Sequence, residues 1–231
     1  MAELIVVCGA AGALGQAVVA ELAGQRLDVA AVARHQPDPN LVPDPATTRP
    51  LLHRLGADLS DPGDVERLWA EIDELGQVAA LVNLVGGYAG GAVTNTDVTT
   101  YRSLIELNLS TTWWVCRAAA SRLSGQGRGA ILNVGSRTAL HGGAGAAAYA
   151  VAKAGVLKLT EVLAAELAPS HVRVNAVLPG VIDTPANRAS MGKAALAGAV
   201  PPEAIAKVIS FLVSERAWPI SGAAIPVYGW G

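Results

Sequence analysis

Short apolar runs alternate along the chain with longer segments of helical periodicity. The apolar runs predict seven strands, at Leu4–Cys8, Asp28–Ala33, Leu51–Ala57, Val78–Leu84, Ala130–Gly135, Val172–Val177 and Ala223–Val227. Successive positions in these runs are apolar, so both faces of the sheet are expected to be covered by helices. The pattern therefore predicts an α/β fold, a doubly wound, seven-stranded, mainly parallel sheet with helices on both faces.

Helical periodicity predicts helices at Ala13–Ala23, Pro62–Leu75, Tyr101–Leu123, Ala146–Leu167 and Pro202–Val213. The clearest is Pro62–Leu75, where Asp61 is suited to cap the start and Gly76 to end the helix. The segment His35–Pro50 contains five prolines in sixteen residues, so we expect a loop there in place of a regular crossover helix. No linker composition interrupts the chain, and residues 1–231 are predicted to form a single domain.

Composition and net charge argue against several classes of protein. The chain has 52% hydrophobic and 16% charged residues, far from the composition of a disordered segment. Its net charge of −2 argues against a strongly basic nucleic-acid surface. The N-terminal residues lack a secretory signal, and glycines interrupt the long apolar stretches, so neither export nor membrane insertion is expected.

The two cysteines, Cys8 and Cys116, are too few for a disulfide scaffold and lack the spacing of a metal site. We expect them to be packed as small apolar residues and the protein to be cytoplasmic, with no bound metal.

A glycine-rich turn follows the first predicted strand and leads into a helix. Gly9, Gly12 and Gly15 recur at intervals of three residues. Glycines permit a tight turn and close approach of a pyrophosphate to the helix N-terminus, where free N–H groups favour an anion. The pattern also fits a merely tight connection, but its place after the first strand favours dinucleotide binding.

A second candidate site combines Tyr149 and Lys153, which lie four residues apart and therefore on one helix face. A lysine ammonium near the phenol would lower the pKa of Tyr149 and improve its proton exchange near neutral pH. Ser136, at the end of an apolar strand, could hold a carbonyl oxygen there.

These motifs together resemble the short-chain dehydrogenase/reductase family over essentially the whole chain, which implies a Rossmann-like domain. The family's glycine motif resembles Gly9, Gly12 and Gly15, and its Asn-Asn-Ala-Gly segment resembles the run from Asn83 to Gly86. Its catalytic residues map onto Asn108, Ser136, Tyr149 and Lys153. Further cofactor contacts implied by the resemblance are Leu14, Asp58, Leu59, Tyr149, Lys153, Pro179, Gly180, Ile182 and Thr184.

The resemblance implies an NAD(P)(H)-dependent oxidoreductase that reduces a carbonyl or oxidises an alcohol. Tyr149 would exchange a proton with the substrate oxygen, Ser136 would orient that oxygen, Lys153 would bind the nicotinamide ribose, and Asn108 would hold a connecting water. The segments from Gly86 to Gly91 and from Asp183 to Arg188 resemble dihydropteridine reductases, although that branch generally lacks the serine. Pteridine reduction is therefore an alternative activity, and two further alternatives are a dinucleotide-sensing regulatory protein and a lyase or epimerase.

Cofactor choice depends on the end of the second strand. An acid there binds the ribose hydroxyls of NAD, whereas an arginine accommodates the 2′-phosphate of NADP. The strand ends with Ala33 and Arg34 and has no acid at Ala33, which favours NADP(H) over NAD(H).

The family resemblance also suggests a substrate lid at about 183–201 and assembly into a homotetramer or homodimer. Gly87, Tyr88, His141 and Met191 indicate a small substrate pocket of mixed polarity. Function cannot be inferred from a shared fold alone, so the small-molecule substrate stays unnamed.

Overall fold

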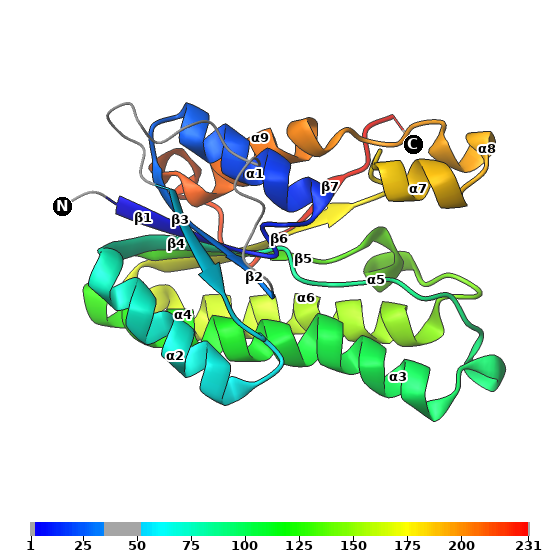
Figure 1. Cartoon of the computed structure of the whole chain (residues 1–231), viewed down its shortest axis with the longest axis horizontal. Coiled ribbons are helices and arrows are strands. Elements are labelled where there is room, and N and C mark those ends of the chain that lie inside the picture. Colours follow the sequence, from blue (N-terminus) through cyan, green and yellow to red (C-terminus); the bar gives the residue numbers. More distant parts are fainter. Residues whose placement is uncertain (1–2, 35–51, 231) are drawn as a thin grey trace.

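The computed structural model describes residues 3–34 and 52–230, and its central element is a seven-stranded parallel sheet (Figure 1). The spatial order of the strands is β3-β2-β1-β4-β5-β6-β7, and every neighbouring pair is parallel. The strands are β1 (Glu3–Cys8), β2 (Asp28–Ala33), β3 (Leu52–Gly56), β4 (Gln77–Asn83), β5 (Gly129–Val134), β6 (Val172–Pro179) and β7 (Ala224–Val227). The predicted doubly wound α/β fold is confirmed.

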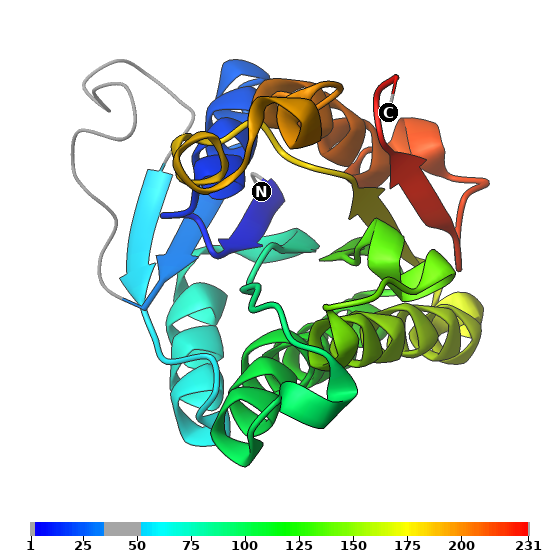
Figure 2. The same cartoon turned by 90° about the vertical axis from the view of Figure 1, so that its right-hand side faces the viewer.

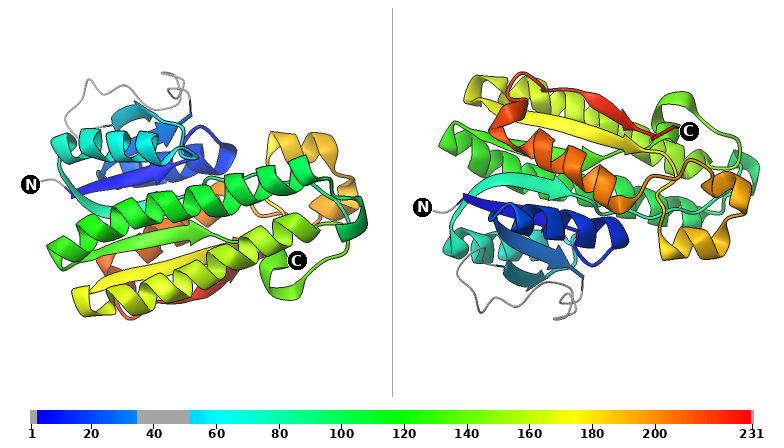
Figure 3. Two further views of the ribbon diagram at one scale, coloured as in Figure 1. Left: turned by 90° about the horizontal axis from the view of Figure 1, so that it is seen from below. Right: turned by 90° about the horizontal axis from the view of Figure 1, so that it is seen from above.

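Helices cover both faces of this sheet. The α-helices are α1 (Ala13–Gly24), α2 (Pro62–Leu75), α3 (Val98–Ile105), α4 (Thr111–Gln126), α5 (Arg137–His141), α6 (Ala147–Leu167), α7 (Pro185–Ser190), α8 (Lys193–Leu196) and α9 (Pro202–Val213). Short 3-10 turns are η2 (Val93–Asn95), η4 (Ala168–Ser170) and η5 (Glu215–Ala217). The views from below and above show α2, α4 and α6 on one face and α1 and α9 on the other (Figure 3).

The alternation of side chains along β1 separates two hydrophobic cores. Leu4 and Val6 are buried against the layer that contains Trp69 of α2, whereas Ile5 and Val7 are buried in the layer of α1 and α9. Successive side chains of a strand point to opposite faces, so a strand covered on both sides must be apolar at every position. This explains the continuous apolar runs in the sequence.

The carboxyl ends of the strands meet at one end of the molecule. Figure 2 looks onto this end, where the loops that follow the strands converge, and α5, α7 and α8 lie at the same end in Figure 1. In an open parallel sheet, ligands bind in the crevice outside these carboxyl ends. The fold thus brings distant motifs to one edge.

The clearest predicted helix has the expected boundaries. The Asp61 carboxylate accepts hydrogen bonds from the backbone N–H groups of Gly63 (2.6 Å) and Asp64 (3.3 Å), and Gly76 follows the last helical residue with φ of 154°. A side-chain oxygen at this position satisfies N–H groups that have no partner within the helix.

The prediction of one continuous α-helix at Tyr101–Leu123 was wrong. The structure has α3, then a π-helical turn (η3, Glu106–Ser110), then α4. Asp97 caps the start of α3 by accepting the N–H of Thr100 at 2.7 Å, so the helical segment begins earlier than predicted. Local periodicity does not indicate a π turn, which frequently occurs at functional sites. The predicted proline-rich loop 35–50 and Leu51 lie outside the described residues.

Within the described ranges, every helix falls short of the length and apolar character that a membrane crossing requires.

Candidate functional site

The turn between β1 and α1 requires glycine at two positions. Gly9 has φ of +82°, and its N–H donates to the carbonyl of Val32 at 2.9 Å. A Cβ atom on Gly9 would lie 3.1 Å from the backbone of Leu84, and one on Gly15 would overlap the carbonyl oxygen of Gly9. Gly12 caps α1, and a Cβ there would make only an ordinary contact with the Gly9 carbonyl oxygen at 3.5 Å, so packing does not require glycine at this position.

A groove of about 240 Å³ lies beside this turn. It is lined by Gly9, Ala11, Gly12, Ala33, Arg34, Ala57, Asp58, Leu59, Ser60, Val85, Leu107 and Thr111. The predicted cofactor residues Gly9, Gly12, Arg34, Asp58 and Leu59 therefore share one groove. It lies where the N-terminus of α1, with its free N–H groups, favours an anion.

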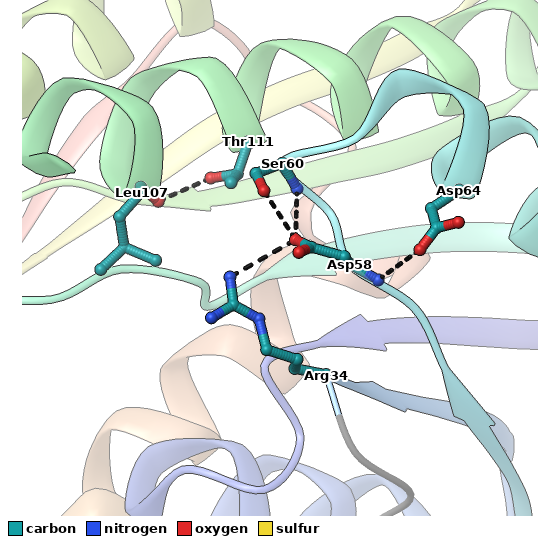
Figure 4. A network of polar contacts seen from close by, with 6 residues as sticks. All are labelled: Arg34, Asp58, Ser60, Asp64, Leu107 and Thr111. Atoms are coloured by element: carbon teal, nitrogen blue, oxygen red, sulfur yellow. Dashed lines mark hydrogen bonds and ion pairs between the residues drawn. The ribbon is translucent and has the colours of Figure 1, made fainter. Parts of the chain in front are cut away.

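Arg34 and Asp58 meet across the groove (Figure 4). The Arg34 guanidinium lies 3.4 Å from the Asp58 carboxylate, and both side chains are substantially exposed. Asp58 also accepts hydrogen bonds from the Ser60 hydroxyl (2.7 Å) and backbone N–H (3.0 Å). These two bonds, followed by the charge of Arg34, lower the pKa of Asp58. Asp58 is thus a fixed carboxylate, while Arg34 extends into solvent at the groove.

Asn83 and Asn108 are buried, and both side chains fix neighbouring backbone. Asn108 lies in the π-helical turn; its amide oxygen accepts the Gly87 N–H at 3.2 Å, and its amide nitrogen donates to the Gly87 carbonyl at 3.0 Å. Asn83 donates to Thr112 at 3.0 Å and accepts the N–H of Val85 at 3.3 Å. Both side chains therefore hold the chain that leaves β4.

Ser136 and Tyr149 lie together beyond the carboxyl end of β5. Ser136 ends the loop after β5, and its hydroxyl is 2.9 Å from that of Thr138. Burial raises the pKa of the half-buried Tyr149 phenol, and a hydrogen bond with Ser136 opposes this effect. The phenol is therefore protonated near neutral pH and available as a proton donor.

Lys153 lies one helical turn beyond Tyr149 on α6, as the spacing predicted. Its ammonium is buried and donates to the carbonyl of Val134 at 2.9 Å. Burial lowers the pKa of Lys153 to about 8. The expected lowering of the Tyr149 pKa by this ammonium was wrong for this structure, because burial of the phenol dominates and Lys153 points to a backbone carbonyl.

The predicted cofactor residues after β6 make local contacts in the segment that leads into α7. Ile182 pairs with Val200 through an isolated bridge, and the Thr184 hydroxyl caps α7 by accepting the N–H of Asn187 at 3.2 Å. Pro179 ends β6, and a Cβ on Gly180 would lie 3.8 Å from Tyr228. The side chain of Leu14 packs into the core beneath α1. Leu14, Gly15, Asn83, Gly86 and the residues after β6 do not line the groove itself.

Sequence reasoning missed several groove residues: Ala11, Ser60, Val85, Leu107 and Thr111. Ala11 and Ser60 adjoin predicted residues and could have been found by proximity. Leu107 and Thr111 come from the π turn and the start of α4; the Thr111 hydroxyl donates to the Leu107 carbonyl at 2.6 Å (Figure 4). No local motif indicates that these two residues face the glycine turn.

Both cysteines are buried free thiols, as expected. Burial raises the pKa of Cys116 to about 12 and that of Cys8 further. No group of His, Cys, Asp and Glu side chains in the described part of the chain could hold a metal ion.

Comparisons with known proteins agree with this geometry. The family model described as short chain dehydrogenase matches residues 3–194. A 7alpha-hydroxysteroid dehydrogenase of Bacteroides fragilis is 30% identical, over 98% of this chain and 93% of its own. A cyclopentanol dehydrogenase of Comamonas testosteroni is 34% identical, over 72% of this chain and 70% of its own.

Solved structures share the fold. A short-chain dehydrogenase/reductase from Burkholderia xenovorans has a TM-score of 0.90 and 30% identity, covering 98% of this chain and 95% of its own. ElxO with NADP bound also has a TM-score of 0.90, at 23% identity, covering 98% of this chain and 97% of its own. The relatives favour neither pteridine reduction nor a non-catalytic sensor. The glycine turn, the Ser136–Tyr149–Lys153 arrangement and these matches place the chain in the short-chain dehydrogenase/reductase family, as an NAD(P)-dependent oxidoreductase of alcohols and carbonyls.

Proposed function

We propose that this enzyme interconverts a ketone and a secondary alcohol of a small molecule, with NADP(H) preferred and Tyr149 as the acid/base. The observation that carries the proposal is the half-buried Tyr149 phenol beside Ser136, on the same helix as the buried ammonium of Lys153. The names of two relatives, a 7alpha-hydroxysteroid dehydrogenase and a cyclopentanol dehydrogenase, support a hydroxyl carried by a ring carbon.

A dinucleotide suits the groove because Gly9 and Gly12 line it without side chains, so a pyrophosphate can approach their backbone closely. The backbone of Gly9 and Gly12 would hold the pyrophosphate, and Arg34 and Asp58 would hold the adenosine end. Pro179, Gly180, Ile182 and Thr184 remain proposed contacts for the nicotinamide half. A bound dinucleotide supplies hydride to the carbonyl carbon, or accepts it from the alcohol.

Side chains of the protein transfer a proton to the substrate oxygen and orient it. In reduction, the Tyr149 hydroxyl gives its proton to the carbonyl oxygen, and the C=O double bond becomes C–OH; oxidation reverses this transfer. The Ser136 hydroxyl donates a hydrogen bond that orients the same oxygen. Lys153, with a pKa of about 8, is positively charged near neutral pH and would bind the nicotinamide ribose of the dinucleotide.

Asn108 acts as a positioning residue in this proposal. Its buried amide fixes both backbone groups of Gly87, next to the site where a Cβ on Gly86 would lie 2.9 Å from the Lys153 ammonium. The implied role of Asn108 in holding a water stays a prediction.

The preference for NADP(H) rests on Arg34. Its guanidinium has five N–H donors and approaches Asp58 through one of its nitrogens at 3.4 Å. A 2′-phosphate would therefore find charge-assisted donors at the groove. Without an acid at Ala33, the ribose hydroxyls of NAD(H) lack the carboxylate that usually binds them.

Calorimetric titration with NADPH and NADH tests the cofactor proposal. We expect NADPH to bind at least tenfold more tightly to the wild type, a difference of about 1.4 kcal/mol. Arg34→Gln should remove most of this preference, whereas Arg67→Gln, on the exposed face of α2, should keep it. Equal affinities of the wild type for both dinucleotides would contradict the assignment of Arg34.

Tyr149→Phe tests the catalytic proposal. Removing a positioned acid/base group should lower kcat by about 10²- to 10⁴-fold while NADPH affinity changes little. A Tyr149→Phe enzyme with wild-type kcat would refute the assignment.

We further propose that the segment 183–201 covers bound substrate and that the chain forms a homotetramer or homodimer. Trp113 and Trp218 are 51% and 75% exposed, and large exposed aromatic side chains are typical of protein interfaces. Light scattering should give a mass of two or four chains, and a monomer would reject the assembly. The cytoplasmic location stays a prediction.

A further inference from the structure

Tyr88 contacts the catalytic phenol yet leaves most of its own ring in solvent. Its ring centroid lies 5.1 Å from that of Tyr149 with an interplanar angle of 79°, an edge-to-face arrangement. The side chain is nevertheless 67% exposed. Tyr88 is also the only residue from Gly86 to Gly91 with a side chain larger than a methyl group. The segment therefore presents one aromatic ring beside the proton donor.

Hydrogen bonds at both ends hold this segment in place. At one end Gly87 is bound to the Asn108 amide through its N–H (3.2 Å) and its carbonyl (3.0 Å). At the other end the Gly91 N–H donates to the Gly145 carbonyl at 2.7 Å, and the Ala147 N–H donates to the Gly91 carbonyl at 3.1 Å. Ala147 is the first residue of α6, the helix that carries Tyr149. The backbone before Tyr88 is thus tied to the π-helical turn, and the backbone after it to the start of the helix that carries Tyr149.

An edge-to-face contact with Tyr149 uses only part of the Tyr88 ring. Aromatic rings attract one another in edge-to-face or offset arrangements, because the ring face is negative and the edge positive. A planar ring attached to a carbon at Tyr149 could therefore pack against Tyr88 and exclude water from both surfaces. Holding the aromatic ring in place beforehand reduces the ordering cost of such binding.

The surroundings of Tyr88 favour an uncharged ligand. A crevice of about 310 Å³ beside it is lined by Gly87, Tyr88, Ala89, Thr99, Thr100, Ser103, Leu104 and Leu107, none of which is charged. The Arg137 guanidinium, next in sequence to Ser136, lies 5.0 Å from the centre of the Tyr228 ring, and Arg188 on α7 donates to Asp183 at 2.8 Å. Both guanidinium groups therefore contact other protein groups.

We propose that Tyr88 is a specificity-determining residue that packs against a planar, uncharged ring bonded to, or containing, the reacting carbonyl carbon. The inference rests on the proposed role of Tyr149 and specifies its substrate class as aryl or ring-conjugated ketones and the corresponding alcohols.

The test compares ketones of matched carbon skeleton. Acetophenone and 1-tetralone carry planar rings, whereas cyclohexyl methyl ketone and 1-decalone carry saturated ones. We measure kcat and KM with NADPH for the wild type, Tyr88→Phe, Tyr88→Leu and the control Tyr101→Leu, which removes an exposed aromatic ring from α3. Circular dichroism and calorimetric titration with NADPH check the fold and dinucleotide binding of each variant.

The wild type and Tyr88→Phe should prefer the planar ketone of each pair. In Tyr88→Leu, kcat/KM for the planar ketones should fall about fivefold, equal to about 1 kcal/mol, mainly through KM, while the saturated ketones change less than about twofold. Tyr101→Leu should behave like the wild type.

Two results overturn the inference. One is an equal change for both members of each pair in Tyr88→Leu, which would mean that Tyr88 only supports Tyr149. The other is a wild type that binds NADPH but does not prefer the planar ketones or reduces none of them. Failure of the wild type to bind NADPH or NADH would instead refute the proposed function on which the inference rests.

Discussion

Replacing Lys153 with methionine should stabilise the cofactor-free protein near neutral pH while abolishing its activity. The Lys153 side chain is 4% exposed, and its ammonium has a hydrogen bond to the Val134 carbonyl. Burying this charge costs free energy, since burial lowers the pKa from 10.5 to about 8. Methionine has a similar length and no charge, so Lys153→Met removes that cost.

The pKa difference sets the size and sign of the effect. Above pH 10.5 the lysine is neutral in the folded and unfolded states, and there is no cost. As the pH falls from 10.5 to about 8, only the unfolded lysine takes up a proton, so the free energy of unfolding decreases. At about 1.4 kcal/mol per pKa unit, the full cost below this window is about 3 kcal/mol.

Loss of the hydrogen bond to Val134 offsets about 1 kcal/mol of this gain. The net stabilisation of Lys153→Met is therefore about 2 kcal/mol at about pH 7 and close to zero at about pH 10.

Urea unfolding of cofactor-free protein at these two pH values measures the difference, because other titrating groups are common to both proteins and cancel. Lys158→Met, which removes an exposed lysine from the same helix, controls for the loss of a lysine as such. A stability difference between Lys153→Met and the wild type that stays constant with pH would refute the reasoning that the buried ammonium carries the cost.

Further substitutions test the glycine turn and the backbone clamp, the pair of hydrogen bonds that the Asn108 amide makes with Gly87. Gly15→Ala places a methyl group against the backbone of the turn, so it should destabilise the protein by at least about 3 kcal/mol and abolish NADPH binding in calorimetry. Gly24→Ala, where a Cβ meets nothing within 4 Å, should instead stabilise the same helix by about 0.5–1 kcal/mol; equal effects of the two changes would contradict the steric argument. Gly86→Ala would bring a Cβ to 2.7 Å from the Asn108 amide oxygen and 2.9 Å from the Lys153 ammonium, so kcat should fall with little loss of helical circular dichroism. Asn108→Ala removes hydrogen bonds of a fully buried amide and should lower the free energy of unfolding by about 2–3 kcal/mol; hydrogen exchange at the Gly86–Gly91 segment that stays at the wild-type rate would count against the clamp.

The sequence predicted the layered architecture because strand burial patterns and helix caps depend on residues that are close together in the chain. The apolar residues on both faces of β1 indicated a covered parallel strand, and its two faces do lie in different cores. Asp61 and Gly76 marked the limits of α2 because capping depends on residues within one helical turn. Strand boundaries differed by one or two residues, as for β6, which extends to Pro179.

The π-helical turn at Asn108 escaped prediction for a physical reason. Its residues continue the helical composition of α3 and α4, and nothing local separates them from α-helix. The side-chain contacts of Asn108 with Gly87, in a loop distant in sequence, are tertiary contacts. Such contacts can override local propensity, which is a weak guide to backbone geometry.

The sequence by itself determined the sheet, the glycine turn and the spacing that puts Tyr149 and Lys153 on one helix face, because these depend on periodicity and backbone sterics. Only the tertiary structure decided the pKa of Lys153, the contact between Tyr88 and Tyr149, and the place of Thr111 in the groove. Burial and contacts between distant segments produce these properties, since charge cost and ring packing depend on which groups exclude water from a site.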